Sequence, residues 1–244
     1  MKKKKTGKKI LWTLLIIIAA GAAAFLIYCI PYYHAKGAPD FTADGTVSVS
    51  DEGKYIFYDG PGESTALVFY PGAKVDEKAY NALMVSLAED GTDCFLVKMP
   101  LHLAFFGKNR ADIILDAYDY DTWLMGGHSL GGSMAAEYTK GHEEKVDGLV
   151  FLASFSAADL TGDSKLRCLS VYGSRDRVLD RGKYEKSKNN LPDGALTEIV
   201  IEGGNHAGYA YYGPQRGDGE AEISVEEQIE KTAEAVKVWL TQAP

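Results

Sequence analysis

Short apolar runs alternate along most of the chain with longer stretches in which apolar residues recur every three or four positions. In the stretch 76–90, for example, Ala79, Leu83 and Leu87 share one face of a helix. The short apolar runs are typical of buried strands. Because strands and helices alternate, we expect an α/β fold, with a mainly parallel central sheet and helices on both faces. The expected strands are 46–50, 55–58, 66–70, 94–98, 122–125, 148–152, 167–172 and 197–201, and the expected helices are 76–90, 109–118, 129–140, 181–189 and 225–241.

The amino-terminal segment has a different pattern. Residues 10–30 contain no charged side chain, and this length is close to the roughly 20 residues that a helix needs to cross a bilayer. Six lysines precede it, so the positive-inside rule places that end in the cytoplasm. We therefore expect a single-pass protein of the cell membrane with an extracytoplasmic domain. A cleaved signal peptide is the alternative, although its apolar region is usually shorter.

These patterns divide the chain into four parts. We expect a basic cytoplasmic tail (1–9), a transmembrane anchor (10–30), a linker (31–45) and one folded domain (46–244). No motif lies upstream of Gly37, so a fragment that starts near this residue should be soluble and keep its activity.

Charge and cysteine content exclude several classes of protein. After the six amino-terminal lysines the chain carries 20 basic and 34 acidic residues, a net charge of −14, which is a poor match for nucleic acid. Three cysteines are too few for a disulfide-dense scaffold. No cysteine or histidine pair has metal-ligand spacing, so we expect no metal and no cofactor. The sequence gives no indication of the oligomeric state.

The motif that carries chemistry is Gly-His-Ser-Leu-Gly at 127–131. An apolar run precedes it and a helix rich in small residues follows, which is the strand–turn–helix setting of a nucleophile elbow. Such a turn presents the Ser129 hydroxyl above the edge of the sheet, at the amino-terminal end of a helix. We expect the side chain of His128 to point away from this nucleophile.

Four motifs in order give the chain a resemblance to a known family. They are FYPGA at 69–73, GHSLG at 127–131, YGSRD at 172–176 and GGNH at 203–206. From about Val47 onward the chain resembles the α/β hydrolases, in particular their compact, lidless branch that includes dienelactone-hydrolase-like proteins. Those relatives use a cysteine nucleophile where this chain has Ser129, so their specific activity is not implied.

The resemblance implies a catalytic triad in the chain order serine, acid, histidine. Of the five histidines, only His206 follows both the elbow and a candidate acid, and His102 is a further candidate for lining the site. Asp176 follows an expected strand and is the preferred acid, since catalytic groups gather at the carboxyl ends of strands. The alternative acids are Asp159, Asp163 and Asp180.

The oxyanion hole requires two backbone N–H donors. The residue after the nucleophile, Leu130, should supply one. The resemblance places the other at Ala73, after Pro71 and Gly72, although this loop departs from the His-Gly-Gly-Gly type, so its neighbours remain alternatives.

The loops indicate the size of the substrate. Only 14 residues separate the expected strands that end at 152 and begin at 167, too few for a large helical lid. Two aromatic loops provide candidate substrate-binding residues: Phe105 and Phe106 as an acyl wall, and Tyr211 and Tyr212 as a pocket rim.

Together these features predict a membrane-anchored serine hydrolase, of the carboxylesterase type, that cleaves a small ester or related acyl bond. Its partners would be a small-molecule acyl substrate and, through the amino-terminal helix, the membrane. An acyltransferase or amidase that uses the same triad is an alternative. A second alternative is a non-catalytic hydrolase-fold binding protein, although such a protein has no need for a complete triad.

Overall fold

A computed structural model describes residues 2–38 and 45–242 of the chain. The chain divides into two compact units, Met1–Tyr32 and Tyr33–Pro244, which we consider separately. Part of the expected linker, residues 39–44, lies outside the described residues.

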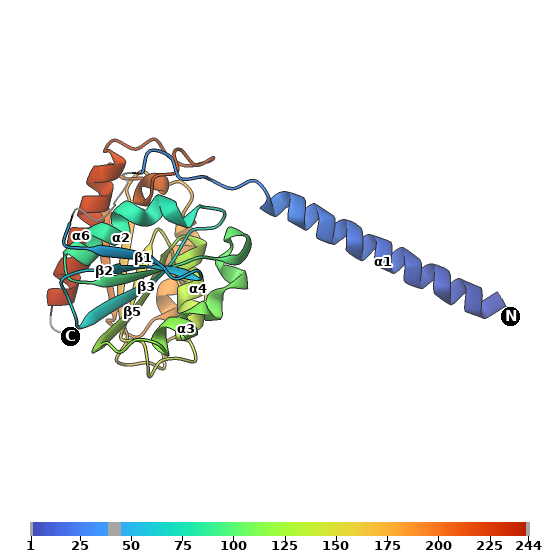
Figure 1. Cartoon of the computed structure of the whole chain (residues 1–244), viewed down its shortest axis with the longest axis horizontal. Helices are drawn as coiled ribbons and strands as arrows, with labels where there is room; N and C mark the ends of the chain where they lie inside the picture. The colour runs from blue at the N-terminus through green and yellow to red at the C-terminus, as the bar shows by residue number, and fades with distance from the viewer. Residues whose placement is uncertain (1, 39–44, 243–244) are drawn as a thin grey trace. The chain divides into compact units, whose positions relative to one another are not determined.

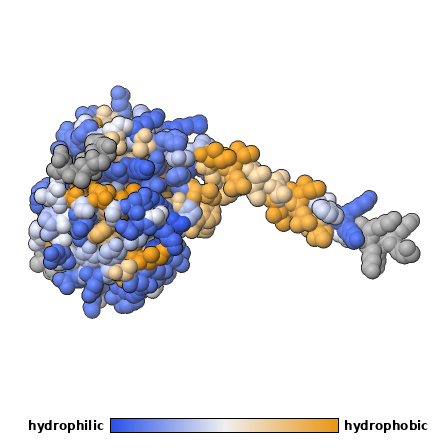
Figure 2. Space-filling view, in the orientation of Figure 1, coloured by the Kyte–Doolittle hydropathy of each residue, from blue (hydrophilic) through white to orange (hydrophobic). Residues whose placement is uncertain are grey.

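The first unit is a single helix, α1 (Lys2–Cys29). Its segment Gly7–Cys29 has 23 residues and a mean hydropathy of 2.6, so it is long and apolar enough to cross a membrane. Figure 2 shows the apolar side chains along this helix.

The second unit is built on one eight-stranded sheet with the order β1-β2-β4-β3-β5-β6-β7-β8. The pairs β1–β2 and β2–β4 are antiparallel, and all other neighbours are parallel. The strands are β1 (Ser48–Asp51), β2 (Tyr55–Asp59), β3 (Thr65–Tyr70), β4 (Asp93–Val97), β5 (Thr122–His128), β6 (Gly148–Leu152), β7 (Arg167–Gly173) and β8 (Leu196–Ile201).

Helices cover both faces of this sheet, as Figure 1 shows. One core lies between the sheet and the pair α2 and α6, and a second core lies between the opposite face and α3 and α4. The α-helices of the unit are α2 (Asn81–Glu89), α3 (Ala111–Leu115), α4 (Leu130–Thr139), α5 (Arg181–Ser187) and α6 (Val225–Thr241). The mainly parallel sheet with helices on both faces confirms the fold class predicted from the sequence.

Two helices differ most from the expected ranges, and each difference has a physical reason. The stretch 76–90 begins as a 3-10 turn, because the Asp76 carboxylate accepts the Lys78 N–H and tightens the first turn ahead of α2. The helix expected at 109–118 ends at Leu115. Asp116, Asp119 and Asp121 follow, and negative charge is unfavourable at the carboxyl end of a helix.

The chain enters the second unit at Tyr33, within the segment that we expected to be a linker. The Tyr33 N–H donates to the carbonyl of Lys74 at 2.7 Å, and the Asp76 N–H donates to the carbonyl of Tyr33 at 2.8 Å. The ring of Tyr33 contacts that of Tyr212, with 5.4 Å between ring centroids. Further along, the Lys36 N–H donates to the carbonyl of Tyr211. Residues 33–36 are therefore attached to the domain.

Candidate active site

Ser129 lies at a sharp turn between β5 and α4. Its φ and ψ of 53° and −123° are unusual for a residue with a side chain. The turn is fixed to β6, because the Ser129 N–H donates to the carbonyl of Leu152 at 2.9 Å. A Cβ atom on Gly131 would overlap the carbonyl oxygen of Tyr70, so only glycine permits α4 to approach β3 this closely. This geometry is that of a nucleophile elbow.

Asp176 and His206 form a buried pair at the carboxyl ends of β7 and β8. Oδ2 of Asp176 lies 2.9 Å from Nδ1 of His206, and both side chains are at most 1% exposed. Oδ1 of Asp176 accepts the N–H groups of Val178 and Leu179 at 2.8 and 2.9 Å. Burial raises the pKa of Asp176, but the hydrogen bonds from His206 and from these N–H groups outweigh it and hold that pKa below its usual value. The carboxylate is therefore ionised near neutral pH.

The loop that carries His206 is held by side chains on both sides. The buried Gln228 of α6 accepts the N–H of Asn205 at 2.9 Å and donates to its carbonyl at 2.8 Å. The N–H of Ala207 donates to Oδ2 of Asp218 at 2.9 Å. These bonds fix the backbone immediately before and after His206. Nε2 of His206 is buried and makes no hydrogen bond to any residue that the structure describes.

The two N–H groups expected to form the oxyanion hole lie after β3 and at the start of α4. Within the described part of the chain, neither Ala73 nor Leu130 donates its N–H to a protein acceptor. The neighbouring Gly72 N–H, in contrast, is bound to the hydroxyl of Tyr80 at 3.0 Å. The loop after β3 thus leaves Ala73 with an available donor, and the first turn of α4 leaves another at Leu130.

Tyr80 and His128 are site residues that the sequence reasoning missed. The Tyr80 hydroxyl lies 2.8 Å from Nδ1 of His128, and both side chains are buried. The ring of His128 lies against that of His206, with 4.7 Å between centroids. Burial lowers the pKa of His128 well below its usual value, and nearby His206 lowers it further, so His128 is neutral. One general rule could have indicated this contact: a buried polar side chain such as that of His128 needs a hydrogen-bond partner.

The hydroxyl of Tyr80 also determines the shape of the loop after β3. A Cβ atom on Gly72 would lie 2.8 Å from Nδ1 of His128 and 2.9 Å from the Tyr80 oxygen. Position 72 therefore requires glycine. The hydroxyl accepts from Gly72 and shares a second hydrogen bond with Nδ1 of the neutral His128, in which the donor depends on the tautomer of the imidazole.

The alternative acids and histidines have other local partners. Asp180 caps α5 by accepting the Lys183 N–H, and Asp159 accepts from Thr161. Asp163 accepts the Lys165 N–H at 3.1 Å. Nδ1 of His102 lies 3.6 Å from a carboxylate oxygen of Glu77. None of these groups approaches His206 as Asp176 does.

The four candidate substrate-binding residues lie in different environments. Phe105 and Phe106 are 66% and 46% exposed, and their rings meet edge to face with 5.4 Å between centroids. Tyr212 is 1% exposed and belongs to the core, where its hydroxyl donates to Gln215. The hydroxyl of Tyr211 donates to Glu226 at 2.6 Å. Binding of substrate by these residues stays a prediction. Among the described residues, no group of three or more His, Cys, Asp or Glu side chains is arranged to hold a metal ion.

Comparisons with known proteins identify the family and the fold. Residues 66–230 match the model of the alpha/beta hydrolase family. No curated protein matches the chain significantly.

Three solved structures illustrate the likeness of the fold. Est1E from Butyrivibrio proteoclasticus is 13% identical, covers 81% of this chain and 100% of its own, and has a TM-score of 0.57. Carboxyl esterase 2 from the fungus Tuber melanosporum is 13% identical, covers 84% of this chain and 91% of its own, and has a TM-score of 0.56. A hyperthermophilic esterase from Pyrobaculum calidifontis is 14% identical, covers 84% of this chain and 88% of its own, and also has a TM-score of 0.56. With a match to the family model over most of the domain, this chain belongs to the alpha/beta hydrolase family.

Proposed function

We propose that the chain is a membrane-anchored serine hydrolase that cleaves small esters or related acyl bonds outside the cytoplasm. The observation that carries the proposal is the buried pair of Asp176 and His206, 2.9 Å apart, which shares one edge of the sheet with the Ser129 elbow. Hydrolase chemistry is supported by the family match, and ester substrates are supported by the esterases among the structural neighbours.

In this proposal Ser129 is the nucleophile. Its hydroxyl oxygen attacks the acyl carbon while Nε2 of His206 takes the proton. Asp176 stays ionised and stabilises the imidazolium through Nδ1. The N–H groups of Leu130 and Ala73 stabilise the negative oxygen of the tetrahedral intermediate. His206 then returns the proton to the leaving alcohol, and water, activated by the same base, releases the acid from the acyl-enzyme.

The connection between β6 and β7 supports a small substrate. Residues 153–166 contain neither a helix nor a strand, so no helical cap arises from this connection. Each CH₂ group buried in a short cleft contributes about 0.8 kcal/mol, and methylenes beyond the cleft contribute nothing. Esters with short acyl groups are therefore the proposed substrates, and a series of p-nitrophenyl esters of increasing acyl length measures this preference.

The proposed location follows from α1. A helix of this length and hydropathy supports a single-pass anchor, and the lysines that precede it support a cytoplasmic amino terminus. The domain that begins at Tyr33 would then face the outside of the cell membrane.

Labelling with a fluorophosphonate tests the proposed nucleophile. The full chain should be labelled, and Ser129→Ala should abolish the labelling. Ser133→Ala is the matched control, because Ser133 lies one helical turn further along α4 and its hydroxyl donates to the carbonyl of Phe155. An unlabelled wild-type chain that is correctly folded would favour a binding protein without turnover.

A further inference from the structure

The loop 101–106, which follows β4, carries an exposed apolar surface. Leu101, Phe105 and Phe106 are 44%, 66% and 46% exposed. Phe105 is the most exposed large apolar side chain among the described residues of the second unit. We name these three residues the apolar loop patch. Exposed aromatic and leucine side chains are typical of protein surfaces that bind at the membrane–water interface.

The backbone holds this patch in an unusual conformation. Leu101 and His102 both have positive φ, at 54° and 53°, although neither is glycine. Such residues are strained and persist only where their surroundings fix them. Here the His102 N–H donates to the carbonyl of Met99 at 3.0 Å, and its carbonyl accepts the Lys74 N–H at 2.7 Å. The exposure of Leu101 is thus built into the fold.

The patch is joined directly to the place where the chain enters the domain. Lys74 binds the loop through its N–H and binds Tyr33 through its carbonyl, which accepts the Tyr33 N–H at 2.7 Å. Only residues 30–32 separate Tyr33 from the last residue of α1. The entry of the chain into the domain at Tyr33 and the loop 101–106 are therefore joined through the backbone of Lys74, which directly follows Ala73 of the proposed oxyanion loop.

We propose that the apolar loop patch docks on the lipid bilayer that holds α1, so that the active site takes its ester from the membrane surface. The proposal rests on the membrane anchor and the hydrolase function proposed above. The domain carries a strong net negative charge, so apolar insertion rather than attraction to anionic lipid would drive the docking. A bilayer-borne ester would then reach Ser129 from the side on which the patch lies.

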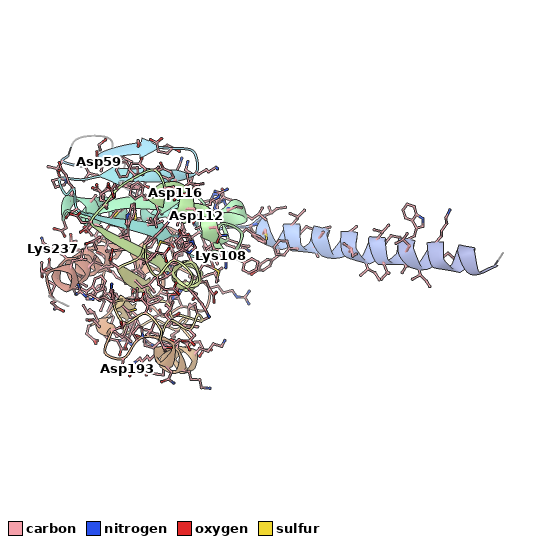
Figure 3. The ribbon with its side chains drawn as sticks, turned by 90° about the horizontal axis from the view of Figure 1, so that it is seen from below. Asp59, Lys108, Asp112, Asp116, Asp193 and Lys237 are labelled. Atoms are coloured by element: carbon pink, nitrogen blue, oxygen red, sulfur yellow. The ribbon has the colours of Figure 1, made fainter. Side chains whose placement is uncertain are left out.

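The proposal is tested with the full chain in phosphatidylcholine nanodiscs, using depth-dependent fluorescence quenching. An environment-sensitive fluorophore is attached at Asn109→Cys, an exposed position near the patch, and quenched by lipids with spin labels in the upper acyl chain. Val238→Cys on α6 is the matched control, with 41% exposure. Its neighbour Lys237 lies on the other side of the domain from Lys108, which adjoins Asn109 (Figure 3). We expect quenching at position 109 to exceed that at position 238 several-fold.

A second variant separates docking from mere tethering. Phe105→Glu places a charge in the patch and leaves α1 intact, so it should reduce the quenching at position 109 to the level found at position 238. Equal quenching at the two positions, or quenching at position 109 that Phe105→Glu does not change, would overturn the proposal. Quenching requires no turnover. Loss of fluorophosphonate labelling on the same discs would therefore count against the hydrolase function alone.

Discussion

The hydroxyl group of Tyr80 lies 2.8 Å from Nδ1 of His128 and simultaneously accepts the N–H of Gly72 at 3.0 Å. One buried oxygen thereby connects the proposed oxyanion loop to the residue that precedes the nucleophile. Because the ring of His128 packs against His206, the positions of the oxyanion loop and the proposed base depend on each other.

Removal of this hydroxyl should therefore affect turnover more than binding. Tyr80→Phe leaves the Gly72 N–H buried without its acceptor, which costs about 1–3 kcal/mol, and frees the oxyanion loop to move. We expect kcat for a p-nitrophenyl ester to fall about tenfold or more, with a small change in KM. Tyr138→Phe is the control, since its buried ring carries a hydroxyl that donates to Asp112 away from the site. Equal losses in the two variants would refute the connection.

The neutral state of His128 predicts how stability depends on pH. Its pKa is lowered in the folded protein, so the unfolded chain binds a proton more readily below about pH 6.5. Stability should fall as the pH drops through that range, by at most about 1.4 kcal/mol per pH unit for this proton. The titratable groups that face it include His206, Asp176, Tyr80 and Tyr209.

His128→Gln measures the contribution of this group, since its amide can still form a hydrogen bond with Tyr80 but does not titrate. Urea unfolding of the full chain in detergent should be compared at pH 7 and pH 5.5. The wild type should lose more stability than the variant over this interval. Identical losses would show that His128 does not contribute to the pH dependence.

Asp176→Asn tests the proposed acid. An amide would donate to Nδ1 of His206 and so favour the wrong tautomer, while its oxygen still accepts from Val178 and Leu179. We expect an intact fold and a kcat that is lower by about 10³–10⁴. Asp180→Asn, which changes only the cap of α5, should remain active. The assignment fails if Asp176→Asn stays near wild type while Asp159→Asn or Asp180→Asn is inactive.

The attachment of Tyr33 predicts where an active fragment must start. A fragment that begins at Pro31 keeps the pairing of Tyr33 with Lys74 and Asp76, and one that begins at Gly37 loses it. The longer fragment should have a Tm that is higher by at least a few degrees and should label more completely with fluorophosphonate. Indistinguishable fragments would mean that residues 33–36 contribute nothing to the site.

The orientation of the anchor is tested on intact cells. Protease added from outside should degrade the domain and leave a small membrane-protected piece that contains α1. Lysis before protease addition provides the control for complete digestion. A domain that resists protease until the cells are lysed would reverse the proposed topology.

The sequence predicted the elements of the fold well, because the alternation of apolar runs reflects burial on both faces of the sheet. It also identified Ser129, Asp176 and His206 as candidates. Each lies in a short motif that contains glycine and follows an expected strand, and such a motif can be recognised from neighbouring residues alone. It did not predict the connection between Tyr80 and His128. Those residues are 48 positions apart, and only the tertiary packing of α2 and β5 brings them together. The attachment of Tyr33 was missed for the same reason, as its partners are backbone groups with no signature in the sequence.

The backbone angles of Ser129 have an evolutionary consequence. A φ of 53° with a ψ of −123° suits glycine, and a serine held there costs about 1–3 kcal/mol. Ser129→Gly should therefore unfold at a higher temperature than the wild type while losing the proposed nucleophile. Selection for stability and selection for turnover oppose each other at this single position. In relatives in which catalysis is no longer under selection, glycine should replace this serine early. A glycine at position 129 would therefore identify relatives that have lost the activity.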